Sequence, residues 1–240
     1  MQSLQKNDKP TASSHAAIIR ARNLSRTYTL GESRITGVDA VDLEIAAGEL
    51  VLLTGVSGSG KSTLLSLLAG LDRPTAGELT VAGRDLSQAS GASLDDYRRH
   101  VVGMVFQSFN LMPTLDVLEN VCLPALLAGR PMADVRKRAT ELLGWLNLGP
   151  RLAHLPAQLS GGEMQRTAIA RALINDPAVI LADEPTGNLD SRNGAVVIDL
   201  LTELNRASGK TIVIATHGGL ADKAATRRIR LGDGRIQWDG

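Results

Sequence analysis

The sequence is poor in aromatic residues, in cysteine and in net charge. Aromatic residues make up 2% of the 240-residue chain against 43% hydrophobic residues overall, so aliphatic side chains must build the core. Cys122 is the single cysteine, which excludes an internal disulfide and fits a reducing compartment, where we expect it to be a small buried side chain. A formal net charge of +1 gives no strong field for nucleic acid, and we predict no nucleic-acid partner.

Targeting signals and membrane-spanning runs are lacking as well. The first six residues do not contain the apolar stretch of a signal peptide. No apolar run approaches the roughly 18 residues that span a bilayer. We therefore expect a soluble, cytoplasmic protein that reaches a membrane only through a partner. Residues 1–16 have the composition of a disordered tail, and one domain is predicted over 17–240.

A glycine-rich stretch at 55–62 carries the strongest chemical signal. It follows the apolar run 50–53 and opens onto a helical pattern, the setting in which GxxxxGKS binds phosphates through backbone N–H groups. The alternative is a plain Gly/Ser turn. Lys61 is expected to reach the β- and γ-phosphates and Ser62 to ligate Mg²⁺. The residues predicted to contact the nucleotide are Gly55, Val56, Ser57, Gly58, Ser59, Gly60, Lys61, Ser62 and Thr63.

Two carboxylates end a second apolar run, at 179–182. Asp183 fits a direct or water-mediated Mg²⁺ contact, because a hard cation at phosphates prefers oxygen ligands. Glu184 is then placed to polarise a water that attacks the γ-phosphate. A solvated acidic turn before Pro185 is the alternative, and the phosphate loop favours the catalytic interpretation.

A second helix start at 160–163 also suits an anion. Ser160 and Glu163 form a capping box, which is sufficient reason for the pattern. The backbone N–H groups of Ser160, Gly161 and Gly162 would nevertheless make an anion site. Two such helix starts with one phosphate-loop lysine suggest a nucleotide held between two chains.

At these residues the sequence resembles the ATP-binding cassette (ABC) ATPases, whose signature motif is similar to the stretch 159–166. The resemblance implies that Ser160, Gly161 and Gly162 of one subunit close over the ATP of another, in a homodimer that ATP closes and hydrolysis reopens. It implies an α/β fold: a P-loop NTPase core with a parallel sheet, an N-terminal antiparallel β subdomain and a helical subdomain at about 110–165.

The resemblance also assigns roles to four residues outside these motifs. Tyr28 would stack on adenine, although packing at a strand edge is the alternative. Gln107 would sense Mg²⁺ and water and link to the transport partner, and Asp190 would lie in the loop that crosses the dimer interface. His217 would contact the γ-phosphate, although Gly218 stands where the family commonly has aspartate.

Element predictions follow from apolar periodicity and turn residues. Tyr28 is expected soon after the end of the first strand, and the helical pattern over 115–145 should be broken at Pro124, Gly129 and Pro131. Strands are predicted at 17–21, 38–45, 78–81, 101–105, 179–182 and 211–215, and helices at 93–99 and 193–205.

The stretches 106–111, 119–121 and 183–190 resemble the lipoprotein-releasing and macrolide-exporter branch of the family. That resemblance implies an ATPase subunit, with ATP and Mg²⁺ as ligands, which drives export or extraction through an integral membrane permease from the inner face of the membrane. A soluble mechanical ABC ATPase is the alternative, but it usually carries a coiled-coil insertion or a second cassette. Glu184 and His217 argue against a regulator without turnover.

Overall fold

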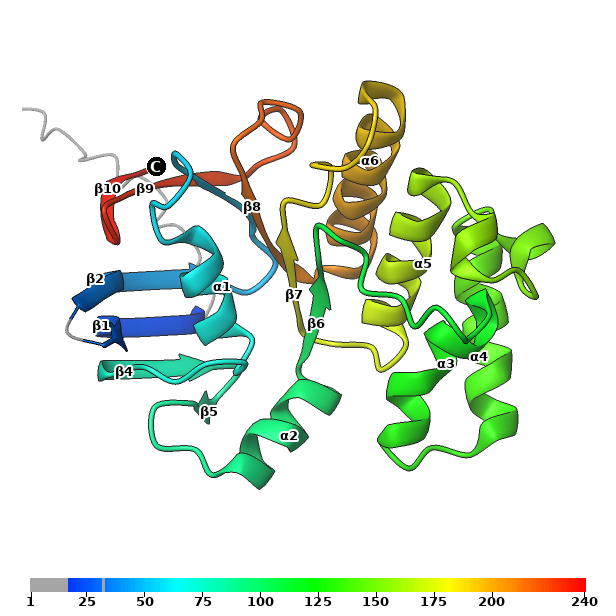
Figure 1. Cartoon of the computed structure of the whole chain (residues 1–240), viewed down its shortest axis with the longest axis horizontal. Helices are drawn as coiled ribbons and strands as arrows, with labels where there is room; N and C mark the ends of the chain where they lie inside the picture. The colour runs from blue at the N-terminus through cyan, green and yellow to red at the C-terminus, as the bar shows by residue number, and fades with distance from the viewer. Residues whose placement is uncertain (1–16, 32) are drawn as a thin grey trace, which may run out of the picture.

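The computed structural model describes residues 17–31 and 33–240, so the predicted tail at 1–16 lies outside the described residues. Two sheets lie on either side of helix α1 (Figure 1). The strands are β1 (Ala17–Leu30), β2 (Ser33–Ala46), β3 (Leu50–Thr54), β4 (Ala76–Val81), β5 (Arg84–Asp85), β6 (Val102–Val105), β7 (Val179–Asp183), β8 (Thr211–Thr216), β9 (Arg227–Gly232) and β10 (Arg235–Asp239). The helices are α1 (Lys61–Leu68), α2 (Gly91–His100), α3 (Val117–Leu127), α4 (Met132–Trp145), α5 (Gly161–Leu173) and α6 (Ser191–Ser208), with 3₁₀ turns η1 (Gly149–Arg151) and η2 (Pro156–Gln158).

The core sheet has the strand order β10-β9-β3-β8-β7-β6, and every neighbouring pair except β10–β9 is parallel. Successive side chains of a strand point to opposite faces of the sheet. In β3, Leu50 and Leu52 join a buried cluster with α3 to α6, whereas Val51 and Leu53 join a second cluster with α1, α2 and the other sheet. The predicted α/β fold with a parallel core sheet is therefore confirmed, with one antiparallel edge strand added.

The second sheet is antiparallel, in the order β2-β1-β4-β5, as the N-terminal part was predicted to be. Its first strand was predicted too short. Tyr28 lies inside β1, which stays paired with β2 as far as the Leu30–Ser33 partners. The register of the β1–β2 pairing shifts between residues 21 and 27. Such β-bulges disturb the apolar–polar alternation from which strands are predicted.

Helix α3 contradicts one predicted break. Pro124 lies within the helix rather than ending it, although proline removes one backbone donor. The chain does break at Gly129, with φ of 79°, and Pro131 is the N-cap of α4. Packing of α3 in the same buried cluster as α4 and α5 accounts for the continuous helix, because tertiary burial overrides local propensity. The boundaries of a helical subdomain at 110–165 stay a prediction.

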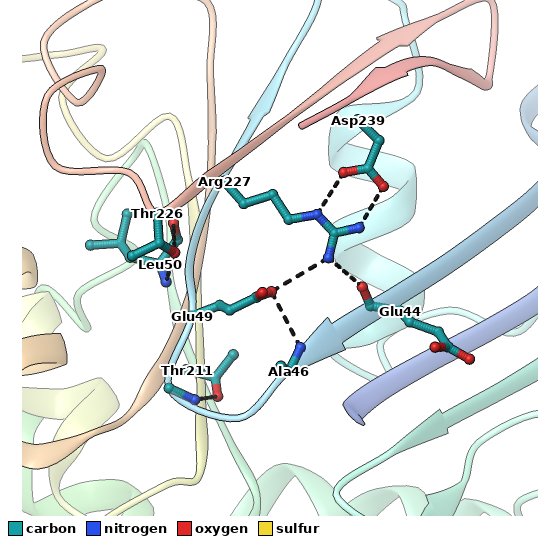
Figure 2. Close-up of polar contacts among 9 residues, drawn as sticks. Glu44, Ala46, Glu49, Leu50, Thr211, Thr226, Arg227 and Asp239 are labelled. Atoms are coloured by element: carbon teal, nitrogen blue, oxygen red, sulfur yellow. Dashed lines mark hydrogen bonds and ion pairs between the residues drawn. The ribbon is translucent and has the colours of Figure 1, made fainter. Parts of the chain in front are cut away.

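The hairpin of β9 and β10 was not predicted, because exposed charged residues interrupt its apolar pattern. Arg227 joins this hairpin to both sheets (Figure 2). Its guanidinium binds both carboxylate oxygens of Asp239, donates to the backbone carbonyl of Glu44 at 2.6 Å and lies 3.5 Å from Glu49 Oε2. The bidentate pair with Asp239 lies within the hairpin and fixes the orientation of the guanidinium, and the bond to Glu44 then ties the hairpin to β2 of the second sheet.

Within the described part of the chain, no helix combines the length and the apolar character needed to cross a membrane.

Candidate functional site

The phosphate loop connects β3 to α1, as the sequence predicts. Gly60 is the N-cap of α1 with φ of 103°, and a Cβ there would lie 2.2 Å from the carbonyl oxygen of Gly37. Only glycine fits that conformation and that approach. The positive end of the α1 dipole is thereby presented at the loop, where an anion is favoured.

Lys61 is the first residue of α1, and its side chain turns back over the loop. Its Nζ donates to the carbonyls of Gly55 at 2.8 Å and Val56 at 3.0 Å. The residue is only 7% exposed. Its two hydrogen-bond acceptors are neutral carbonyls, so the positive charge is available to attract an anion that enters the loop.

Predicted residues from both sheets line one cavity of about 650 Å³. Its walls bring together chain segments that are almost 190 positions apart in sequence. Three of the lining residues, all on β2, were not predicted from the sequence. A glycine inside a strand pattern, Gly37, was the available signal of a close approach. The lining comprises Tyr28, Ile35, Thr36, Gly37, Val56, Ser57, Gly58, Ser59, Gly60, Lys61, Ser62, Thr63, Gln107, Glu184 and His217.

Ser62, which lines the cavity, and Asp183, which is outside the lining but contacts Ser62, offer oxygen atoms that fit a hard cation. Ser62 Oγ donates to Asp183 Oδ1 at 3.2 Å, so a hydroxyl and a carboxylate converge. Burial raises the pKa of Asp183, and the neighbouring Glu184 carboxylate adds to the rise, so a cation would relieve both effects. Among residues 17–31 and 33–240, no cluster of three histidine, cysteine or acidic side chains could hold a metal alone.

Glu184 and His217 form a direct pair at the cavity wall. Glu184 follows β7 and His217 follows β8, two adjacent strands, and His217 Nδ1 lies 2.7 Å from Glu184 Oε1. Glu184 has φ of 46°, which non-glycine residues seldom adopt. With its ring proton on Nδ1, His217 would donate to the Glu184 carboxylate and orient it. The sequence placed both residues near the γ-phosphate but did not reveal this pairing.

Gln107 lies in a loop held from two sides. Asn188 Nδ2 donates to its backbone oxygen at 2.9 Å. From α5, Arg171 donates to the carbonyls of Phe109 and Asn110, at 2.7 Å for Phe109, and Gln165 Nε2 lies 3.5 Å from the Phe106 oxygen. Helix α5 thus forms hydrogen bonds with the chain on both sides of Gln107.

The signature residues lie together with Asp190, outside the lining of this cavity. Ser160 caps α5 and Asp190 caps α6, each accepting from the third residue of its helix. A Cβ on Gly162 would lie 2.4 Å from Asn193 Oδ1, so the two helix starts are in close contact. The structure thus separates the predicted residues into two sets, one around the phosphate loop and one at the start of α5 and α6.

Comparisons with known proteins agree with this geometry. The model of the ABC transporter family matches residues 38–187. A lipoprotein-releasing system ATP-binding protein LolD from Xanthomonas campestris pv. campestris (strain 8004) is 44% identical over 95% of this chain and 96% of its own length. The macrolide export ATP-binding/permease protein MacB of Sodalis glossinidius is 47% identical over 92% of the chain, which spans 34% of MacB.

Solved structures of similar fold are also ATP-binding cassettes. A dimeric post-hydrolysis state of the ATP-binding cassette MJ0796, bound to ADP and Pi, superposes with a TM-score of 0.86 at 42% identity, covering 92% of this chain and 97% of that one. The predicted resemblance is confirmed: the chain belongs to the ABC transporter family and is one of its ATP-binding, ATP-hydrolysing subunits.

Proposed function

We propose that this subunit hydrolyses ATP to drive export or extraction across the cell envelope, through a membrane permease in the lipoprotein-releasing and macrolide-export branch. The observation that carries the proposal is the single cavity in which the phosphate loop meets Gln107, Glu184 and His217. MacB is named as an ATP-binding/permease protein, and this chain spans 34% of it. The partner of this ATPase would be an integral membrane permease, with the ATPase docked on its cytoplasmic face.

In the proposed binding mode, N–H groups of the phosphate loop and Lys61 hold the β- and γ-phosphates. Tyr28 supports the adenine at the other end of the cavity. Ser62, Asp183 and Gln107 would hold Mg²⁺, which when bound neutralises charge on the phosphates. The convergence of Ser62 Oγ and Asp183 Oδ1 at 3.2 Å supports that assignment.

In the proposed reaction, Glu184 accepts a proton from the attacking water, and His217 orients the Glu184 carboxylate. The hydrogen bond of 2.7 Å between the two side chains supports this division of roles. His217 is also the residue that would contact the γ-phosphate, which requires its ring to keep Nδ1 on Glu184 and turn Nε2 to the phosphate. General base catalysis of this kind contributes about 10²- to 10⁴-fold to rate.

A second copy of the chain would complete the site with Ser160, Gly161, Gly162 and Asp190. Their grouping at the starts of α5 and α6, outside the cavity, supports a contribution to a neighbouring subunit's nucleotide. The dimeric state of the MJ0796 cassette supports the same arrangement.

The Glu184→Gln variant tests the assigned chemistry. It preserves shape and removes the charge, so turnover should fall by about 10²-fold or more while ATP affinity stays within about threefold of the parent. Phosphate release and calorimetry measure the two quantities. Glu141→Gln, an exposed change on α4, is the matched control. Parental turnover in Glu184→Gln would contradict the assigned chemistry.

The membrane partner is tested separately, by purifying this protein from detergent-solubilised membranes. Its isolation without any permease would favour the soluble mechanical alternative.

A further inference from the structure

Asp72 connects the two ends of the nucleotide cavity. It lies just after α1, whose N-terminus carries the phosphate loop, and it contacts two residues of β1. Asp72 Oδ2 accepts from Tyr28 Oη at 2.8 Å and from Arg26 Nε at 2.8 Å. Arg26 Nη2 lies 2.8 Å from Asp72 Oδ1, so the ion pair is bidentate. Bidentate pairs fix geometry as well as charge.

Arg26 also covers one face of the Tyr28 ring. Its guanidinium carbon lies 4.5 Å from the ring centroid, within cation–π range. Tyr28 lines the cavity, whereas Arg26 is outside the set of described residues that line it. The guanidinium thus covers one face of a ring that lines the cavity, which leaves a single face for a base to stack on.

The cluster is sheltered enough for these contacts to be effective. The side chains of Arg26 and Asp72 are 23% and 22% exposed. Burial by itself raises the pKa of Asp72, but hydrogen bonds from Tyr28, the Arg73 backbone and Arg26 outweigh it and lower the pKa. The carboxylate thus stays ionised and holds both partners at neutral pH.

We propose that Arg26 and Asp72 are positioning residues for the nucleotide base: they lock the Tyr28 ring as a platform at a set distance from the phosphate loop. This inference rests on the proposed role of Tyr28 at the adenine. An aromatic ring that is already immobilised loses less freedom when a base stacks on it, so binding is tighter. The backbone N–H of Asp72 donates to the Ser66 carbonyl of α1 at 3.2 Å, so the platform is tied to the helix that begins at the phosphate cradle.

The chain contains a matched ion pair that lacks these properties. Arg20, on the same strand, pairs with Glu44 at 3.1 Å, and their side chains are 57% and 45% exposed. Neither residue belongs to the cavity lining. Removing Arg20 therefore reports what an ordinary surface pair on β1 contributes.

The test compares ADP with pyrophosphate, neither of which this ATPase turns over. Calorimetry with excess Mg²⁺ gives both affinities for the parent and for Tyr28→Ala, Arg26→Met, Asp72→Asn and Arg20→Met. We expect Tyr28→Ala to weaken ADP about 5- to 150-fold, as loss of one base stack does. Arg26→Met and Asp72→Asn should weaken ADP about 2- to 10-fold. Pyrophosphate should stay within about twofold throughout, and Arg20→Met should match the parent for both ligands.

Three other results would overturn the inference. If Tyr28→Ala weakens ADP selectively while Arg26→Met and Asp72→Asn do not, the positioning role is wrong and the adenine platform stands. Equal losses of ADP and pyrophosphate in those two variants would mean general damage and would also overturn the inference. If Tyr28→Ala itself leaves the ratio of the two affinities unchanged, the adenine assignment fails and the inference with it. Asp72→Asn is close to isosteric, so it keeps the test valid if Arg26→Met does not fold.

Discussion

Glu163 loses its proton more readily than an ordinary glutamate because of its neighbours. Hydrogen bonds from the backbone N–H of Ser160, from Arg151 and from the Ser160 hydroxyl lower its pKa to about 2. The same carboxylate closes the capping box at the start of α5. The signature helix start, with the proposed anion site, is therefore held in place by one ionised side chain.

This lowered pKa predicts acid sensitivity. A carboxylate whose pKa is lower in the folded state than its ordinary 4.5 stabilises the fold above pH 4.5, and that contribution is lost as pH falls from 4.5 towards about 2. Glutamine can still accept the capping hydrogen bond but cannot titrate. Glu163→Gln should therefore lower Tm at pH 7 and reduce the fall in Tm between pH 5 and pH 3. Thermal unfolding by circular dichroism across this range measures it, with Glu141→Gln as the control, and an unchanged slope in Glu163→Gln would refute it.

At the scale of elements, α5 relates one proposed site to the other. Its first residues carry the signature motif, and its last turns hold the loop of Gln107 through Arg171. Phe109 and Asn110, whose carbonyls Arg171 binds, have φ of 60° and 50°. Two successive residues in this sparsely populated region cost about 1–3 kcal/mol each, so the loop needs such an anchor to keep its shape.

Removing the Arg171 side chain should impair Mg²⁺-dependent ATP hydrolysis more than it impairs nucleotide binding. We expect Arg171→Met to raise the Mg²⁺ concentration for half-maximal ATPase activity, or to lower kcat, by about 10-fold, as loss of an outer-shell support does. ADP affinity should stay near that of the parent. Arg130→Met is the matched control, because Arg130 also donates to a backbone carbonyl, that of Ile174 at 3.1 Å, away from the Gln107 loop. If Arg171→Met and Arg130→Met change the Mg²⁺ dependence equally, the contacts of Arg171 with the Gln107 loop do not determine Mg²⁺ use and the prediction is wrong.

At the scale of the whole molecule, the proposed site needs a second copy of the chain to be complete. The cavity of one subunit supplies the phosphate loop, and the starts of α5 and α6 lie outside its lining. The dimeric cassette that this chain resembles at 42% identity is bound to ADP and Pi. A ligand held between two subunits stabilises whichever assembly binds it better.

Trapped ATP should therefore produce a dimer. Glu184→Gln with ATP and Mg²⁺ should elute as a dimer in size-exclusion chromatography with light scattering, and as a monomer without nucleotide. Adding Ser160→Arg, which places bulk at the proposed anion site, should abolish that dimer. Adding Ser208→Arg instead, at the exposed end of α6, should leave it intact. A monomeric Glu184→Gln at saturating ATP, or a dimer that survives Ser160→Arg, would contradict the shared site.

The sequence by itself determined the features whose geometry is local. The phosphate loop, the carboxylates at the end of β7 and the capping box of α5 each depend on neighbours within a few positions, so residue order specifies them. Only the tertiary structure decided the pairing of Glu184 with His217, the Arg26–Tyr28–Asp72 cluster and the grip of Arg171 on the Gln107 loop. These contacts with Asp72, Glu184 and Arg171 join residues 33 to 62 positions apart, and the intact helix at Pro124 and the hairpin tied by Arg227 likewise depend on distant partners. Local patterns carry no record of such partners, because burial and pairing are settled when the sheets and helices pack together.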